Sequence, residues 1–198
     1  MRSANSMSRA LRGGLLALAA CASIAPAFAG GPLYVVPAGG TVKTARWMGT
    51  VQVYTDQGSL GSVDNATANQ LVANTLTQWS SVPTSSFRAV IAGTLPEDIT
   101  GANAGSVIGA RNGGGIQVIY DSDGSVLADF IGVGYGVLGI ATPEYLAGEG
   151  STQIVEGWMI IRGEEDFSVY QEWYPDMDYV PGQPTSGIVT HEFGHAIN

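Results

Sequence analysis

The sequence predicts an α+β fold, in which a twisted mixed β-sheet packs on two helices. Several short segments alternate apolar and polar residues or stay apolar for about four to eight positions, which is typical of strands. Residues 64–79 and the end of the chain instead place apolar residues at helical spacing. Hydrophobic residues make up 45% of the 198 positions, which is enough for a core, and charged residues only 13%. With 28 glycines, this composition indicates a loop-rich exported protein rather than a coiled coil.

The first 29 residues have the features of an export signal. Three arginines form a positive start, residues 15–24 are apolar, and residues 27–29 (Ala-Phe-Ala) match an A-x-A cleavage site. The apolar stretch is too short to cross a bilayer as a helix. Cleavage after Ala29 would remove three positive charges and no acidic residue, which changes the net charge from −9 to −12. We therefore expect a secreted or periplasmic mature chain.

A second interpretation of this segment is a lipoprotein signal. Residues 18–21 (Leu-Ala-Ala-Cys) resemble a bacterial lipobox, which would leave the chain anchored through Cys21. However, the residues after Cys21 stay apolar through Phe28, where a lipoprotein usually has a polar tether, so we favour the free form. We expect no integral membrane segment in the mature chain. Its acidic charge also argues against nucleic acid as a partner.

The domain itself is predicted to span residues 46–198, after a Gly- and Pro-rich lead-in at residues 30–45 that has no clear periodicity. Alternation predicts a first strand from Trp47 to Tyr54, and the glycines of residues 58–61 predict a turn. Asp64 or Asn65 can cap the long helix. Its apolar positions are Ala68, Leu71, Val72, Leu76 and Trp79, and Pro83 ends the segment.

Three further strands are expected at Phe87–Ala92, Ile116–Tyr120 and Gln153–Ile161, with a glycine-rich loop over residues 101–115. Asp121 to Gly124 follow the second of these strands. The two carboxylates of this segment could ligate calcium, but the third acidic position and the terminal Glu of an EF-hand loop are missing. We therefore interpret Asp121–Gly124 as a turn, and calcium is not supported.

The Gly132–Thr142 segment is predicted to form a thin edge strand that Pro143 closes. Acidic residues at 164–166, 176 and 178 are expected in solvated loops. Thr185 or Ser186 can cap the last helix, which begins shortly before the end of the chain.

That last helix carries the most informative motif of the chain. His191 and His195 are the only two histidines, and Glu192 lies between them in an H-E-x-x-H pattern. Residues four apart lie on one face of a helix, so both imidazoles can reach one ion. Zinc accepts imidazole nitrogen, and a glutamate beside it can act as general base toward a zinc-activated water. The motif therefore predicts a zinc hydrolase, most simply a peptidase.

The residues around the motif predict that this helix is buried. Its other positions are mostly apolar: Ile188, Val189, Phe193, Ala196 and Ile197. Buried His and Glu must find partners, and a shared cation would supply one. Gly194 costs about 1 kcal/mol relative to Ala inside a helix, so we expect it to allow close packing against another backbone.

Two histidines do not complete a catalytic zinc site, which normally has three protein ligands. Acidic residues upstream, such as Glu156, could contribute, but nothing in their spacing selects one of them. We expect the third ligand beyond Asn198, so that the catalytic domain is incomplete at its C-terminus. The 198-residue chain alone should then bind zinc weakly and be inactive.

The motif resembles that of the metzincin zinc peptidases, in particular the matrixin-like branch of secreted bacterial proteins. Their longer pattern is H-E-x-x-H-x-x-G-x-x-H. His191, Glu192 and His195 match its first three functional positions, while Asn198 stands where the family usually has Gly. Asn is the next residue most tolerant of a positive φ. The resemblance implies one catalytic zinc, a third histidine at position 201 and a protein or peptide substrate.

The resemblance also assigns a substrate-binding strand. The residues Gly136, Val137, Leu138, Gly139, Ile140 and Ala141 are similar to the edge strand that pairs with extended substrate in matrixins. Many matrixins have a structural-zinc histidine in this segment, and none stands here, so we infer no second zinc.

Two other interpretations remain open. The chain could be a zincin of another branch, with a downstream Glu as third ligand. It could also be a non-catalytic surface or adhesion module with an idle zinc site, although the intact Glu192 argues against this.

Overall fold

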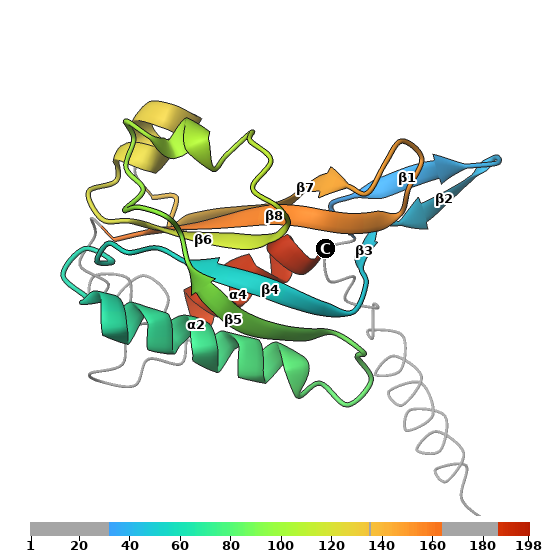
Figure 1. Cartoon of the computed structure of the whole chain (residues 1–198), viewed down its shortest axis with the longest axis horizontal. Helices are drawn as coiled ribbons and strands as arrows, with labels where there is room; N and C mark the ends of the chain where they lie inside the picture. Colours follow the sequence, from blue (N-terminus) through green and yellow to red (C-terminus); the bar gives the residue numbers. More distant parts are fainter. Residues whose placement is uncertain (1–31, 135, 164–185) are drawn as a thin grey trace, which may run out of the picture. The chain divides into compact units, whose positions relative to one another are not determined.

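A six-stranded sheet separates two layers in the part of the protein that the computed structural model describes, residues 32–134, 136–163 and 186–198 (Figure 1). The strand order is β3-β8-β6-β4-β5, and β7 pairs with β8. The pairs β3–β8, β8–β6, β6–β4 and β4–β5 are parallel, whereas β7 is antiparallel to β8. The predicted mixed sheet with two packed helices is confirmed, and most of its pairs are parallel. The strands are β3 (Arg46–Trp47), β4 (Thr50–Thr55), β5 (Arg88–Thr94), β6 (Gly115–Asp121), β7 (Gly139–Leu146) and β8 (Gln153–Arg162).

The first predicted strand is broken into two pieces. β3 ends at Trp47 and β4 begins at Thr50, because Gly49 between them has a φ of +75° that leaves the extended conformation. As a result β3 pairs with β8, whereas β4 pairs with β5 and β6. Alternation continued across this break, so the sequence pattern could not show it.

The lead-in segment also differs from expectation, because it contains a hairpin. β1 (Val35–Ala38) pairs antiparallel with β2 (Thr41–Thr44). Gly39 and Gly40 connect them with φ values of +57° and +82°, the positive angles that a two-residue hairpin turn of type I′ requires. The Gly-Gly pair was the available signal for this hairpin.

Helix α2 (Asn65–Ser80) matches the predicted long helix. The Asp64 carboxylate caps it by accepting the backbone N–H of Thr67 at 2.9 Å, as expected for an N-cap residue. Its apolar face, which includes Leu71, Val72 and Leu76, is buried against the sheet.

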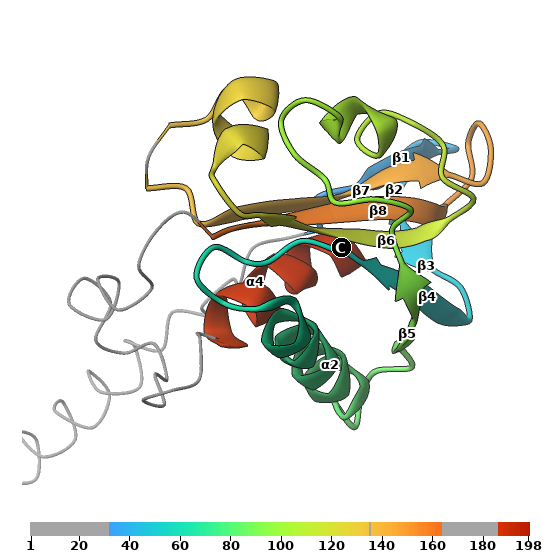
Figure 2. The same cartoon turned by 60° about the vertical axis from the view of Figure 1, so that its left-hand side comes forward.

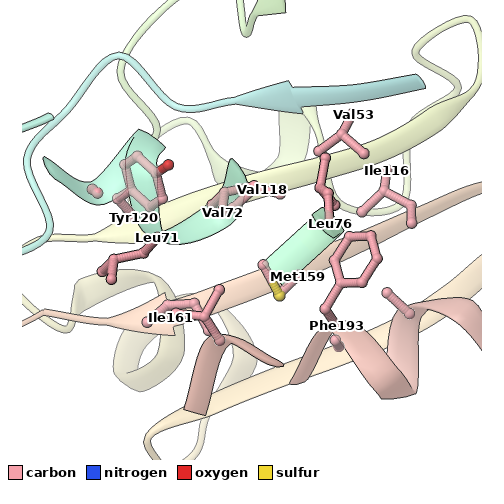
Figure 3. Close-up of a cluster of buried hydrophobic side chains, with 14 of the residues drawn as sticks. Val53, Leu71, Val72, Leu76, Ile116, Val118, Tyr120, Met159, Ile161 and Phe193 are labelled. Carbon is pink, nitrogen blue, oxygen red and sulfur yellow. The ribbon is translucent and has the colours of Figure 1, made fainter. Parts of the chain in front are cut away.

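Helices α2 and α4 (Ser186–Ile197) lie side by side on the same face of the sheet (Figure 2). Between them and the strands lies a continuous apolar core, whose members include Val53, Val118, Met159 and Phe193 (Figure 3). All four side chains are fully buried. Because Phe193 belongs to α4, this helix is part of the main core and not a surface addition.

The opposite face of the sheet is covered by irregular chain. A short 3₁₀ turn η1 (Ala104–Ser106) and a π-helical turn η2 (Val126–Ile131) pack there over a second apolar cluster that includes Ile119, Trp158 and Ile160. The glycine-rich loop expected at residues 101–115 therefore forms part of this cover.

The edge strand lies later in the chain than predicted. The Gly132–Thr142 segment begins in irregular chain, and β7 runs from Gly139 to Leu146. Pro143 does not close the strand but lies inside it, next to an irregularity in the pairing with β8. A proline is tolerated here because an edge strand leaves one side of its backbone free of ladder bonds.

Several predictions fall on residues outside the described ranges. These are the export signal at residues 1–29, the acidic loops at 164–166, 176 and 178, and the proposed cap at Thr185. Within the described ranges, no helix combines the length and the apolar character needed to cross a membrane.

Candidate metal centre

Helix α4 is held on three sides, and its fourth side carries the two histidines. Three of its side chains, Val189, Phe193 and Ala196, are buried in the core beneath the sheet. Phe193 also meets Phe87 in an edge-to-face arrangement, with ring centroids 6.1 Å apart. This confirms the prediction that the motif helix is buried.

The second side of α4 packs on α2 through Trp79. The indole N–H donates to the carbonyl of Thr190 at 3.0 Å. A Cβ added at Gly194 would lie 2.9 Å from Cζ2 of the same indole, so only glycine leaves room for it. We expected Gly194 to allow close packing, and it does, but the neighbour is the indole of Trp79 and not another backbone. An alanine at this position would collide with that indole.

The third side of α4 packs on β7 through Glu192. A Cβ added at Gly139 would lie 2.7 Å from Cγ of Glu192 and 2.9 Å from the carbonyl oxygen of Ile160. The first residue of the edge strand therefore makes space for the glutamate of the motif. Gly139 was predicted as part of a substrate-binding strand, and its contact with Glu192 was not.

The remaining side of the helix presents His191 and His195. Their Nε2 atoms lie 3.1 Å apart, and the rings are nearly perpendicular. Two imidazole nitrogens bound to one tetrahedral zinc, at roughly 2.0–2.1 Å each, lie about 3.3 Å apart. The same distance also suits a hydrogen bond between two neutral rings. His191 is exposed and His195 half-buried, so the pair faces outward.

Glu192 lies beside this pair in a buried position. Its side chain is 9% exposed, and among the described residues no hydrogen bond reaches its carboxylate. Burial raises the pKa of Glu192, while the nearby imidazoles of His191 and His195 act in the opposite direction. A carboxylate with a raised pKa and no backbone donor is suited to accept and release a proton.

The described residues do not supply a third metal ligand. They contain no group of three or more His, Cys, Asp or Glu side chains that could hold an ion together. Glu156 lies two residues before Trp158 in β8, so the two side chains share the face of the sheet opposite α4. There Glu156 accepts the backbone N–H of Asn112 at 2.6 Å. Glu156 is therefore excluded as a ligand beside the histidine pair. The prediction of a ligand at position 201 stays open.

The carboxylates of the turn after β6 accept hydrogen bonds from the backbone that follows them. Asp121 accepts the backbone N–H groups of Val126 and Leu127, each at 2.9 Å, and Asp123 accepts that of Ser125 at 3.0 Å. The interpretation of this segment as a turn is confirmed.

Asn198 has a left-handed backbone conformation. Its φ is +75°, a positive value that asparagine tolerates better than most residues other than glycine. Its side-chain amide also donates to the carbonyls of Tyr34 and Ala45, at 3.0 and 2.9 Å. The end of α4 is thereby attached to the chain around the β1–β2 hairpin.

The predicted substrate-binding residues are divided by the start of β7. Gly139, Ile140 and Ala141 lie in the edge strand and pair with β8, whereas Gly136, Val137 and Leu138 precede it. Within the described sheet β7 pairs only with β8, so its other side is free.

In comparisons with known proteins, no protein-family model, no curated protein and no solved structure matches this chain.

Proposed function

We propose that the protein is a zinc-dependent endopeptidase of the matrixin-like metzincin type. The observation that carries this proposal is the outward-facing pair of Nε2 atoms 3.1 Å apart, with the buried Glu192 next to them on the same helix. Two imidazoles at this separation can share one zinc without a change of helix geometry.

Each residue of the motif has a separate role in this proposal. Bound zinc would lower the pKa of a water molecule and polarise the scissile carbonyl. His191 and His195 supply two of the ligand nitrogens and hold them on one face of α4. Glu192 accepts the proton of the attacking water and transfers it to the leaving amine. Its burial favours this exchange, because burial raises the pKa of Glu192 above that of an exposed glutamate.

The edge strand supports a peptide as the substrate. An extended peptide can add to a free sheet edge through main-chain hydrogen bonds. β7 offers such an edge, and its first residue, Gly139, contacts the side chain of Glu192. A peptide aligned along β7 would therefore run close to the proposed base.

Two further parts of the proposal, the third zinc ligand and export, rest on sequence resemblance alone. The third zinc ligand is proposed at position 201, where the metzincin spacing places a histidine. Export through residues 1–29 would deliver the enzyme to a secreted or periplasmic location.

Zinc content after histidine replacement tests the proposal. In the product of the whole reading frame, His191→Ala or His195→Ala should each abolish stoichiometric zinc, measured by elemental analysis after dialysis. Gln70→Ala, at an exposed position of α2, should leave zinc content unchanged and is the control. If both histidine variants keep their zinc, these residues are not ligands and the proposal fails.

A further inference from the structure

Two indole side chains hold the motif helix at the carbonyls that flank its histidines. Trp79 Nε1 donates to the carbonyl of Thr190, the residue before His191, at 3.0 Å. Trp47 Nε1 donates to the carbonyl of Ala196, the residue after His195, also at 3.0 Å. The backbone of α4 thus accepts one indole hydrogen bond just before the histidine pair and one just after it.

The two indoles come from different elements and anchor different ends of the pair. Trp79 lies in the last turn of α2, and Trp47 is the last residue of β3. The carbonyl of Ala196 lies in the last turn of α4, where no following helical N–H can satisfy it. The bond from Trp47 supplies the missing donor there.

The anchor at Trp79 includes more than one contact. The hydroxyl of Thr190 donates to Gln78 Oε1 at 2.9 Å and lies 3.2 Å from the hydroxyl of Thr75. The indole of Trp79 also fills the space that Gly194 leaves open. The α2 side of α4 is therefore fixed at Thr190 and Gly194, the two positions adjacent to the histidines in sequence.

These contacts control the rotation of α4 about its own axis. Successive residues of a helix differ by about 100° in direction, so His191 and His195 project roughly 100° away from Thr190 and Gly194. A rotation or shift of α4 would move both Nε2 atoms together. It would change their direction relative to β7 and to any third ligand held elsewhere.

We propose that Trp47 and Trp79 are positioning residues of the zinc site, which they align by holding the backbone of α4 on both sides of the histidine pair. This inference rests on the proposed function, because it assigns the indoles a role in metal binding. Neither indole touches the metal or the substrate in this account.

Zinc affinity, compared with thermal stability, shows whether the two indoles align the zinc site or only stabilise the fold. The variants Trp79→Phe and Trp47→Phe remove the N–H donor but keep an aromatic ring. Trp158→Phe is the control, since Trp158 is a tryptophan in the core on the opposite face of the sheet, whereas Trp47 and Trp79 are half-buried beside α4. The product of the whole reading frame is titrated with zinc against a competing chelator, and thermal unfolding is recorded alongside.

We expect Trp79→Phe and Trp47→Phe each to weaken zinc binding about tenfold, the effect of losing one hydrogen bond that orients the ligands. Trp158→Phe should change zinc affinity less than about twofold, even where its unfolding temperature falls by as much as that of the other two variants. At saturating cobalt(II), the visible spectrum should differ from wild type for Trp79→Phe and Trp47→Phe, and not for Trp158→Phe.

Zinc affinity and cobalt spectra that match wild type in both Trp79→Phe and Trp47→Phe would overturn the inference while leaving the proposed function intact. An equal loss of affinity in all three variants would also overturn it, because the effect would then follow stability alone. Failure of the wild-type protein to bind zinc would instead remove the proposed function, and the inference with it. If Trp79→Phe does not fold, the result for Trp47→Phe decides.

Discussion

The protein buries carboxylates in two contrasting ways, one at the carboxyl ends of its parallel strands and one on the motif helix. Asp56 follows β4 and is 0% exposed, and it accepts four backbone N–H groups, from Gln57, Gly58, Ile99 and Tyr120. Glu192 on α4 is 9% exposed, and no described residue donates a hydrogen bond to its carboxylate. Burial raises the pKa of both groups.

This difference distinguishes Asp56, whose carboxylate stabilises the fold, from Glu192, the carboxylate that we propose as the general base. The donors to Asp56 come from three separate stretches of chain, so its carboxylate holds the ends of β4 and β6 and the loop at Ile99 together. These amide donors leave Asp56 little capacity for another partner. The charge of Glu192 is instead faced by two imidazoles. In the proposed function, its carboxylate is therefore the one that exchanges a proton with the substrate.

The largest effect that follows from this contrast is on stability. Asp56→Ala would leave four buried or partly buried backbone N–H groups without their acceptor, and each such loss costs about 1–3 kcal/mol before relaxation. We expect the free energy of unfolding in urea to fall by roughly 4 kcal/mol. Zinc affinity of the folded fraction should not change, because Asp56 lies at the end of β4 and not on α4.

The exposed Glu97→Ala serves as the control and should stay within about 0.5 kcal/mol of wild type. A loss of less than about 1 kcal/mol for Asp56→Ala would remove the structural half of the comparison.

A smaller effect is expected where the edge strand meets the motif. In Gly139→Ala the new Cβ would lie 2.7 Å from Cγ of Glu192, so the glutamate must move. Misplacement of a catalytic group by about 1 Å can reduce the rate roughly 100-fold, and we expect a loss of about this size in kcat/KM on a peptide substrate. Zinc affinity should fall far less, since the atoms nearest to the new Cβ belong to Glu192 and Ile160 and not to a histidine.

Gly134→Ala provides the matched control, because a Cβ there would meet no atom within 4 Å. Equal activity of the Gly139→Ala and Gly134→Ala variants would show that the position of Glu192 does not depend on β7.

Much of the fold follows from local patterns that the sequence displays directly. The helical spacing of Leu71, Val72 and Leu76 and the capping Asp64 predicted α2 to within about one residue at each end. The apolar run at Ile116–Tyr120 predicted β6 in the same way. These elements are set by periodicity and capping, which act within a few residues along the chain.

Features that depend on distant pairing could not be predicted. The break at Gly49 lets β3 and β4 pair with different strands, and no local pattern reveals these partners. Pro143 suggested the end of a strand, yet an edge strand tolerates proline. The Gly39-Gly40 turn was visible in the sequence, and its flanking residues lack the alternation that would have marked strands.

In the candidate site, too, local patterns predicted some features, whereas others depend on contacts between distant parts of the chain. The spacing of His191, Glu192 and His195 was sufficient to place them on one helix. The burial of that helix followed from its apolar residues. The contacts that orient the helix were hidden, because they join α4 to residues more than 100 positions earlier: Trp79 at Thr190, and Trp47 at Ala196. Trp79 was recognised only as an apolar position, and the use of its N–H depends on the tertiary structure.

The most direct test of this account replaces Glu192 by the uncharged amide of the same shape. In Glu192→Gln, made in the product of the whole reading frame, zinc content and zinc affinity should match wild type, because the histidine pair is intact. Hydrolysis of a peptide substrate should fall by roughly 10³-fold in kcat/KM, since the amide cannot accept the proton of the attacking water. Near-native kcat/KM with zinc still bound would contradict the assignment of Glu192 as the base, and with it the distinction between the two kinds of buried carboxylate.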